Sequence, residues 1–309
     1  MMRIFGTTVA ALSLAMATAC AATLHAGPGQ RYATPSQAIA AAHNGDTVMI
    51  AAGTYYDCAI VNQNDLTIEG VGPKSIMTDK PCAGKALLVI NGNNDTVKNL
   101  TLQRARVADG NGGGIRAEGG NLTVDNVRFF NNQDGILSAP NAKATIRVLN
   151  SDFVHNGGCV NAGGCAHAIY VSPISELDVE HSRFYDTQTG HSIKSRALVT
   201  IVKDCTIEDG PDGTSSYQID IPIGGSLIAE GNTLEKGPKS QNHANAIMIG
   251  EEGVSQPTRQ IIVKNNKLIN NTGYTTVFVH NISATPAQLS GNTFSGGKVI
   301  PLAGDGSVH

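Results

Sequence analysis

A loosely periodic repeat runs through most of this 309-residue chain. One apolar residue in each repeat follows a polar corner, and these anchor residues lie 23 to 34 residues apart. Most anchors have a turn residue three positions earlier, as Asn99 precedes Leu102 and Asn126 precedes Phe129. The anchors are Leu102, Phe129, Phe153, Phe184, Ile207, Leu234, Leu268 and Phe294. Such a period predicts a solenoid, in which each coil packs only against its neighbours.

The composition agrees with one elongated domain built of narrow coils. The chain has 35 glycines, seven phenylalanines and no tryptophan, which suits stacked aliphatic interiors better than a large aromatic core. A net charge of −3 provides no general attraction for nucleic acid or for anionic membranes. We therefore expect a single domain over residues 23–309 that acts as a monomer and does not bind nucleic acid.

The first 22 residues are typical of a cleavable secretion signal. Arg3 supplies the positive start, residues 4–16 are apolar, and an alanine-rich end favours cleavage near Ala21 or Ala22. A lipoprotein with Cys20 as the acylated residue is the less favoured alternative, because Ala17 is not a bulky aliphatic residue. No later apolar run is long enough to span a membrane, so we expect a secreted or periplasmic protein.

Export permits disulfide bonds, and five cysteines follow the predicted cleavage point. Cys159 and Cys165 flank a glycine-rich loop that a disulfide could close, while Cys58 and Cys82 lie about one coil apart. A metal site at Cys159 and Cys165 is less favoured, since no second close pair of ligands accompanies them. Cys205 precedes its anchor by two residues and is predicted to face inward as a small buried residue.

A second series of residues locates the outward face of each coil. The central aliphatic residues of one strand per coil are Ile115, Ile136, Ile169, Ile193, Ile219, Ile247 and Val277. Strand residues alternate between faces, so the residue after each aliphatic should face outward. That outward row contains Arg116, Leu137, Tyr170, Lys194, Asp220, Met248 and Phe278. Since rungs stack about 4.8 Å apart, Tyr170, Lys194 and Asp220 should form one patch with Arg196 from the next outward row.

The unequal coil lengths place three longer stretches beside this patch, at residues 157–166, 237–243 and 251–257. Long loops that flank one face of a regular stack form a groove, in which a solenoid can hold a chain-like ligand.

The N-terminal part of the mature chain predicts a short helix at residues 35–42, which would cap the open end of the solenoid. Gly-Asp-Thr-Val at 45–48 and Ala-Gly-Thr-Tyr at 52–55 follow it, and the coils with asparagine corners come next. This arrangement resembles the right-handed parallel β-helix proteins of the pectate-lyase type over roughly residues 30–300. The resemblance implies an all-β, single right-handed parallel β-helix of about nine or ten coils.

The segment 190–196 carries the strongest chemical signal. It brings together His191, Lys194 and Arg196, beside Tyr170 and Asp220 of the neighbouring coils. Cleavage of an acidic polysaccharide by β-elimination needs cations for the sugar carboxylate, a base for the C5 proton and an acid for the C4 oxygen. We predict Lys194 as the base, Arg196 as the carboxylate ligand, and Tyr170 or His191 as the proton donor. The candidate substrate-binding residues are Asp220, His167, Tyr217 and Asn245.

Other reactions of this fold are less well supported by the sequence, and the fold alone does not specify one. A hydrolase of the galacturonase type would need an Asp-Asp pair and an Arg-Ile-Lys motif, and the mannuronan epimerases carry Asp-Pro-His-Asp; neither set occurs here. Calcium is a conceivable cofactor, although its potential ligands have no spacing that identifies a cage. These ligands are Asp220, Asn242, Asn245, Glu251 and Glu252. A non-catalytic carbohydrate-binding or envelope-structural β-helix is the alternative function, because the charged patch could equally be a set of surface ion pairs.

Overall fold

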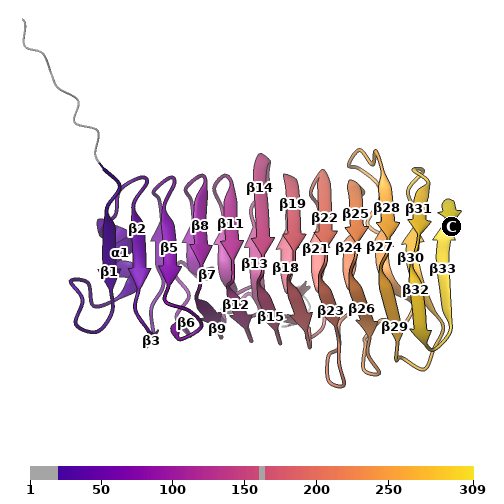
Figure 1. The fold of residues 1–309 in the computed structure, drawn as a ribbon, viewed down its shortest axis with the longest axis horizontal. Coiled ribbons are helices and arrows are strands. Elements are labelled where there is room, and N and C mark those ends of the chain that lie inside the picture. The colour runs from indigo at the N-terminus through magenta and orange to yellow at the C-terminus, as the bar shows by residue number, and fades with distance from the viewer. Residues whose placement is uncertain (1–19, 160–163) are drawn as a thin grey trace, which may run out of the picture.

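The computed structural model describes residues 20–159 and 164–309. Residues 1–19 of the predicted signal lie outside this range. The described chain winds into a parallel β-helix whose three sheets run side by side along its length (Figure 1). Each coil passes from a strand of sheet A to one of sheet B and one of sheet C before the next coil begins. The predicted fold and its ten or so coils are confirmed.

Sheet A consists of β1 (Thr23–Ala26), β2 (Thr47–Ile50), β5 (Thr67–Gly70), β8 (Asp95–Lys98), β11 (Leu122–Asp125), β14 (Asn141–Leu149), β19 (Ile174–Glu180), β22 (Val199–Lys203), β25 (Ser226–Glu230), β28 (Ile261–Lys264), β31 (Ala287–Ser290) and β34 (Gly306–Val308). Sheet B consists of β3 (Gly53–Tyr55), β6 (Ser75–Thr78), β9 (Thr101–Gln103), β12 (Arg128–Phe130), β15 (Asp152–Val154), β20 (Arg183–Tyr185), β23 (Thr206–Glu208), β26 (Thr233–Lys236), β29 (Lys267–Asn270) and β32 (Thr293–Gly296). Sheet C consists of β4 (Ala59–Val61), β7 (Ala86–Ile90), β10 (Gly113–Ala117), β13 (Asp134–Ser138), β18 (Ile169–Val171), β21 (Ile193–Ser195), β24 (Ile219–Ile221), β27 (Asn245–Ile249), β30 (Thr276–Asn281) and β33 (Val299–Gly304).

The predicted capping helix is present as α1 (Pro35–Ala41). Thr34 is its N-cap, with a side-chain oxygen that accepts the Gln37 N–H, and Pro35 lies in the first turn, where its missing N–H costs nothing. Ala38 and Ile39 are fully buried and cover the first coil. Within the part of the chain that the structure describes, no helix has the length and apolarity needed to cross a membrane.

The polar corners turn the chain from sheet A into sheet B through a left-handed backbone conformation. Asn99, Asn126 and Asn150 have φ angles of 57°, 53° and 49°. Among non-glycine residues asparagine tolerates this region best, because its short amide can bond locally. The Asn126 amide also donates to Asn99 Oδ1 at 2.8 Å, which links neighbouring coils. The corner asparagines therefore turn the chain and also join successive coils by hydrogen bonds.

The anchor residues form a continuous stack inside sheet B. The rings of Phe129 and Phe153 lie 4.5 Å apart, and those of Phe153 and Phe184 lie 4.6 Å apart, with nearly parallel planes. Sheet C leaves room for them: a Cβ added at Gly114 or Gly135 would come within 2.7 or 2.8 Å of a phenylalanine ring carbon. Large residues on one sheet thus pack against very small residues on the other.

The register of the coil containing β30 differs from the prediction. Val279, rather than Val277, pairs with Ile247, so that Phe278 occupies the inward position of Ala246. Phe278 is fully buried and makes an edge-to-face contact with Phe294. The prediction of an outward Phe278 was wrong because Val279, not Val277, is the central aliphatic residue of β30. The residue just before the central one faces the core in this sheet, as Gly114 and Ala246 do, so strand alternation does not apply to it.

Both predicted disulfides are present, between Cys58 and Cys82 and between Cys159 and Cys165. The second closes a small hairpin of β16 (Gly158–Cys159) and β17 (Cys165–Ala166). Cys205 faces inward as predicted and is 2% exposed. Burial raises the pKa of its thiol to about 12, which makes it an inert core residue.

Candidate functional site

The charged patch lies on the outer face of sheet C, on three successive rungs. Tyr170 of β18 pairs with Lys194 of β21, which pairs with Asp220 of β24. Arg196 follows β21, and its guanidinium carbon lies 5.1 Å from the centre of the Tyr170 ring, while Lys194 Nζ lies 5.9 Å from it. Parallel stacking therefore brings together two cations and a tyrosine that are 26 residues apart at most.

A pocket of about 440 Å³ opens over these rungs. Two of the irregular stretches predicted to flank a groove form its walls: the disulfide hairpin contributes Cys165 and the 237–243 stretch contributes Gln241. On the other side of Tyr170, a second cavity of about 180 Å³ shares Cys165 and includes Asp134. The residues lining the larger pocket are Gly164, Cys165, His167, Tyr170, Gly190, His191, Lys194, Arg196, Ser216 and Gln241. The two cavities follow the solenoid axis, which suits a chain-like ligand.

A ladder of side chains supports the pocket from one edge of sheet C. The backbone N–H of His167 donates to Asp134 Oδ1 at 2.7 Å, that of His191 to His167 Nδ1 at 2.9 Å, and that of Tyr217 to His191 Nδ1 at 3.1 Å. The three rings stack, with centres 4.9 Å apart in each pair. Asn245 occupies the same position on the next coil. The ladder fixes the direction in which each ring nitrogen points.

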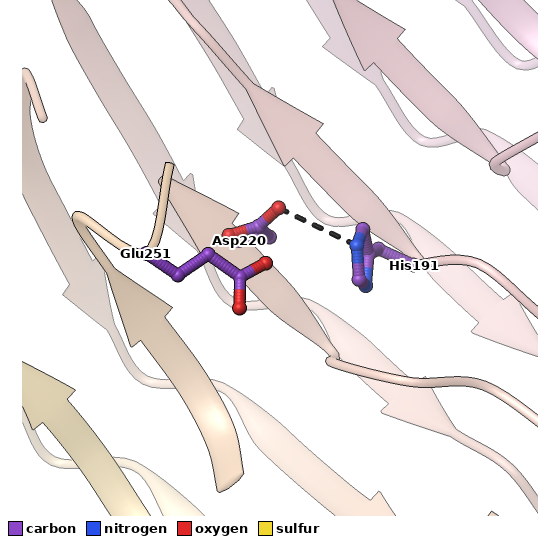
Figure 2. A group of neighbouring side chains, drawn as sticks. All are labelled: His191, Asp220 and Glu251. Atoms are coloured by element: carbon purple, nitrogen blue, oxygen red, sulfur yellow. Dashed lines mark ion pairs between the residues drawn. The ribbon is translucent and has the colours of Figure 1, made fainter. Parts of the chain in front are cut away.

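Both histidines of the ladder are neutral. Because each Nδ1 accepts a backbone N–H, the ring proton must lie on Nε2. Burial lowers the pKa of His167 well below its ordinary value and that of His191 to about 3, with Lys194 adding to both shifts. His191 Nε2 faces Asp220 Oδ2 at 3.4 Å (Figure 2). His191 is thus a neutral ring whose Nε2–H faces Asp220, and not an imidazolium acid.

Asp220 lies deeper than the outward row predicts. Its side chain has no exposed surface, because Lys194 and Glu251 lie against it, the latter on a loop from a coil beyond it (Figure 2). Lys194 Nζ is 3.7 Å from Asp220 Oδ2, and neither carboxyl oxygen of Asp220 has a hydrogen-bond partner among the residues that the structure describes. Burial raises the pKa of Asp220 to about 8, and the Lys194 charge only partly offsets this. In this conformation Asp220 is covered by Lys194 and cannot contact a ligand in the pocket directly.

The raised pKa of Asp220 predicts a distinctive pH dependence for Asp220→Asn. Between the ordinary pKa of an aspartate, near 4, and about 8, folded wild type binds more protons than the unfolded chain. The stabilisation by protonated Asp220 is fully present below the pKa of the unfolded chain, and it is lost as the pH rises through the pKa of the folded protein. From pH 5 to 9, the free energy of unfolding of Asp220→Asn should therefore rise relative to that of wild type, by up to about 1.4 kcal/mol per pH unit.

Urea unfolding at several pH values measures this difference. Asp212→Asn is the matched control, since the Asp212 carboxylate is 71% exposed and pairs with Lys239 at the surface. A pH-independent difference for Asp220→Asn would show that Asp220 is ionised in the folded protein throughout this range.

Two glutamates from the loop after β27 close the patch. Glu252 Oε1 lies 2.7 Å from Lys194 Nζ, and its other oxygen contacts the Arg196 guanidinium. The Tyr217 hydroxyl donates to Glu251 Oε2 at 2.7 Å. The sequence predicts that their loop flanks the groove and offers them as potential calcium ligands. Their pairing with residues 34 to 58 positions earlier has no local sequence signal.

The donor set does not suit a calcium ion. His191, Asp220 and Glu251 can each bring one ligand atom within 4.8 Å of the others. However, His191 Nε2 carries its proton, one Glu251 oxygen accepts the Tyr217 hydroxyl, and the Lys194 ammonium already faces Asp220. Calcium needs about six to eight oxygen ligands. We therefore assign no step of the chemistry to a metal at this cluster.

The structure separates the predicted site residues into three groups. Lys194, Arg196, His191, Tyr170 and His167 all line the pocket. Tyr217 and Asp220 lie next to them but below the surface, whereas Asn245 is not among the described lining residues. Ser216 and Gln241 line the pocket without having been predicted individually, although Gln241 belongs to a stretch predicted to flank the groove.

Comparisons with known proteins agree with the fold. A family model described as "Right handed beta helix region" matches residues 161–308. A crystal structure of the pectate lyase Pel9A superposes with a TM-score of 0.59 at 12% identity, covering 94% of this chain and 79% of that one. An alginate lyase from Paenibacillus sp. str. FPU-7 gives a TM-score of 0.55 at 15% identity, covering 92% of this chain and 99% of that one. A search of curated proteins finds no significant match.

Proposed function

Given that the chain is a right-handed parallel β-helix protein, we propose that it is an exported enzyme that cleaves an acidic polysaccharide by β-elimination. One observation carries the proposal: Lys194, Arg196 and Tyr170 converge at the floor of a groove that follows the solenoid axis. A lysine, an arginine and a tyrosine can together supply the cation, base and acid that this reaction needs. Two proteins of similar fold are called lyases of pectate and of alginate, which favours the same reaction class.

In this mechanism Arg196 binds the carboxylate of the sugar whose C5 proton is removed. The positive charge stabilises the negative charge that develops on the carboxylate when the C5–H bond breaks. Lys194 accepts that proton after losing its own to water, the electron pair forms the C4–C5 double bond, and the C4–O bond breaks. The Tyr170 hydroxyl donates a proton to the departing oxygen. The products are a chain with an unsaturated end and a chain with a free hydroxyl.

The residues below the pocket position these groups. The His167–His191–Tyr217 ladder fixes the edge of the pocket, and neutral Asp220 supports Lys194 without placing a full negative charge under it. We assign His191 to this positioning role and leave the proton donation to Tyr170. Export follows from the predicted signal and agrees with the two disulfides, which persist in oxidising compartments.

A panel of polysaccharides tests the proposal and separates it from the alternatives. The purified protein is incubated with polygalacturonate, polymannuronate, polyguluronate and a neutral glucan, with and without a chelator. Elimination gives one ultraviolet-absorbing unsaturated end for each new reducing end, and we expect the chelator to leave the rate unchanged. Reducing ends without absorbance would indicate hydrolysis. Saturable binding with no change in chain length would favour a non-catalytic carbohydrate-binding protein.

A further inference from the structure

The two cations that line the pocket are already paired with a carboxylate of the protein itself. Glu252 bridges Lys194 and Arg196, one carboxylate oxygen on each cation. Its side chain is 35% exposed, while those of Lys194 and Arg196 are 12% and 24% exposed. Glu252 is therefore more exposed than either cation, and it occupies on each of them the contact that a ligand carboxylate would need.

This arrangement conflicts with the resting geometry that β-elimination requires. An ammonium group paired with a carboxylate has no lone pair with which to accept a proton. The guanidinium that should bind the sugar carboxylate is also occupied. Both obstacles disappear if Glu252 leaves the two cations.

We propose that Glu252 is an internal stand-in for the substrate carboxylate, which the sugar carboxylate displaces from Lys194 and Arg196. The inference rests on the proposed function. After displacement Arg196 holds the sugar carboxylate, and Lys194 releases its proton to water before it accepts the one from C5. The substrate class is accordingly an unesterified polyuronate, since a neutral or methyl-esterified sugar cannot replace the ionic contacts that Glu252 would lose.

The backbone around Glu252 allows its side chain to leave without unfolding the loop. The Glu252 N–H donates to Pro222 O at 2.8 Å, and the N–H groups of Ser255 and Gln256 donate to Ile223 O at 2.9 and 2.8 Å. These bonds hold the base of the loop against the neighbouring coil. The side chain is partly exposed and is held by the two cations, so a rotation about its own bonds would be enough to vacate them.

Glu252→Gln tests the displacement. The glutamine is nearly the same size but forms no ion pair with either cation. If Glu252 competes with substrate, the variant should lower KM for the preferred polyuronate about fivefold or more, because a larger fraction of the protein is ready to bind. Its kcat should stay within about twofold of wild type. Glu230→Gln is the matched control, since it removes a similar glutamate–lysine pair, with Lys264, on sheet A.

The outcomes separate this inference from the proposed function. Polyuronate cleavage by wild type with an unchanged or higher KM in Glu252→Gln, or with a large loss of kcat, would overturn the displacement while leaving the function intact. Failure of wild type to cleave any polyuronate would overturn the function. Calorimetric titration with a galacturonate trisaccharide would then still test Glu252: tighter binding by Glu252→Gln supports displacement, and equal or undetectable binding by both proteins contradicts it.

Discussion

Lys194→Ala should lower kcat for polyuronate cleavage by about 10²- to 10⁴-fold, the range that a general base contributes. The variant removes the only amine that the mechanism uses to accept the C5 proton. Lys194→Arg should be nearly as inactive, because a guanidinium keeps the positive charge and can pair with Glu252 but does not give up its proton near neutral pH. Initial rates of unsaturated-end formation measure both effects.

The pair of Lys194 variants distinguishes catalysis from structure. If Lys194 served only as an ion-pair partner of Glu252 and Asp220, arginine would restore most of the activity that alanine loses. Lys239→Ala is the control, since Lys239 is 60% exposed, pairs with Asp212 and is not among the described residues that line the pocket. Near-wild-type activity in Lys194→Arg would show that Lys194 is not the catalytic base.

Phe153→Ala should lower the free energy of unfolding by about 3–5 kcal/mol, as expected for a large buried aromatic residue truncated in a rigid core. Phe153 has a phenylalanine ring stacked on each face and is fully buried. Little in the surroundings can collapse into the space, since Gly135 backs directly onto the ring. Urea unfolding followed by circular dichroism measures the loss.

The same repeat offers a control for this effect. Phe294 occupies the corresponding anchor position in the last coil of sheet B, where it is 37% exposed. Phe294→Ala should therefore cost less than half as much as Phe153→Ala. Equal losses of unfolding free energy in the two variants would mean that burial in the phenylalanine stack does not determine the contribution of these residues to stability.

The regular part of the molecule could be predicted because each coil repeats the same local physics. Inward anchors such as Phe129, left-handed corners such as Asn126 and the inward Cys205 each follow from a short sequence pattern. Strand alternation also places Tyr170 and Lys194 on one face, and parallel stacking makes them neighbours.

The contacts that define the pocket could not be predicted in the same way, because they depend on the irregular loops. Strand alternation correctly places Asp220 on the outer side of sheet C, but only the loop carrying Glu251 and Glu252 makes that side an interior. The Lys194–Glu252 pair joins residues 58 positions apart across coils of unequal length. The register of β30, which carries Phe278, could not be predicted for the same reason, since the loop before this strand has no fixed length.

The most direct test of the central claim is a crystal structure of Lys194→Ala with the uronate oligosaccharide cleaved by wild type. We expect the oligosaccharide to lie in the groove on sheet C, with one sugar carboxylate against the Arg196 guanidinium. The C5–H of that sugar should point toward the position that Lys194 Nζ occupies in wild type, and the Tyr170 hydroxyl should face the C4 oxygen. An oligosaccharide bound on another face, or with no carboxylate near Arg196, would show that Lys194, Arg196 and Tyr170 do not form the active site.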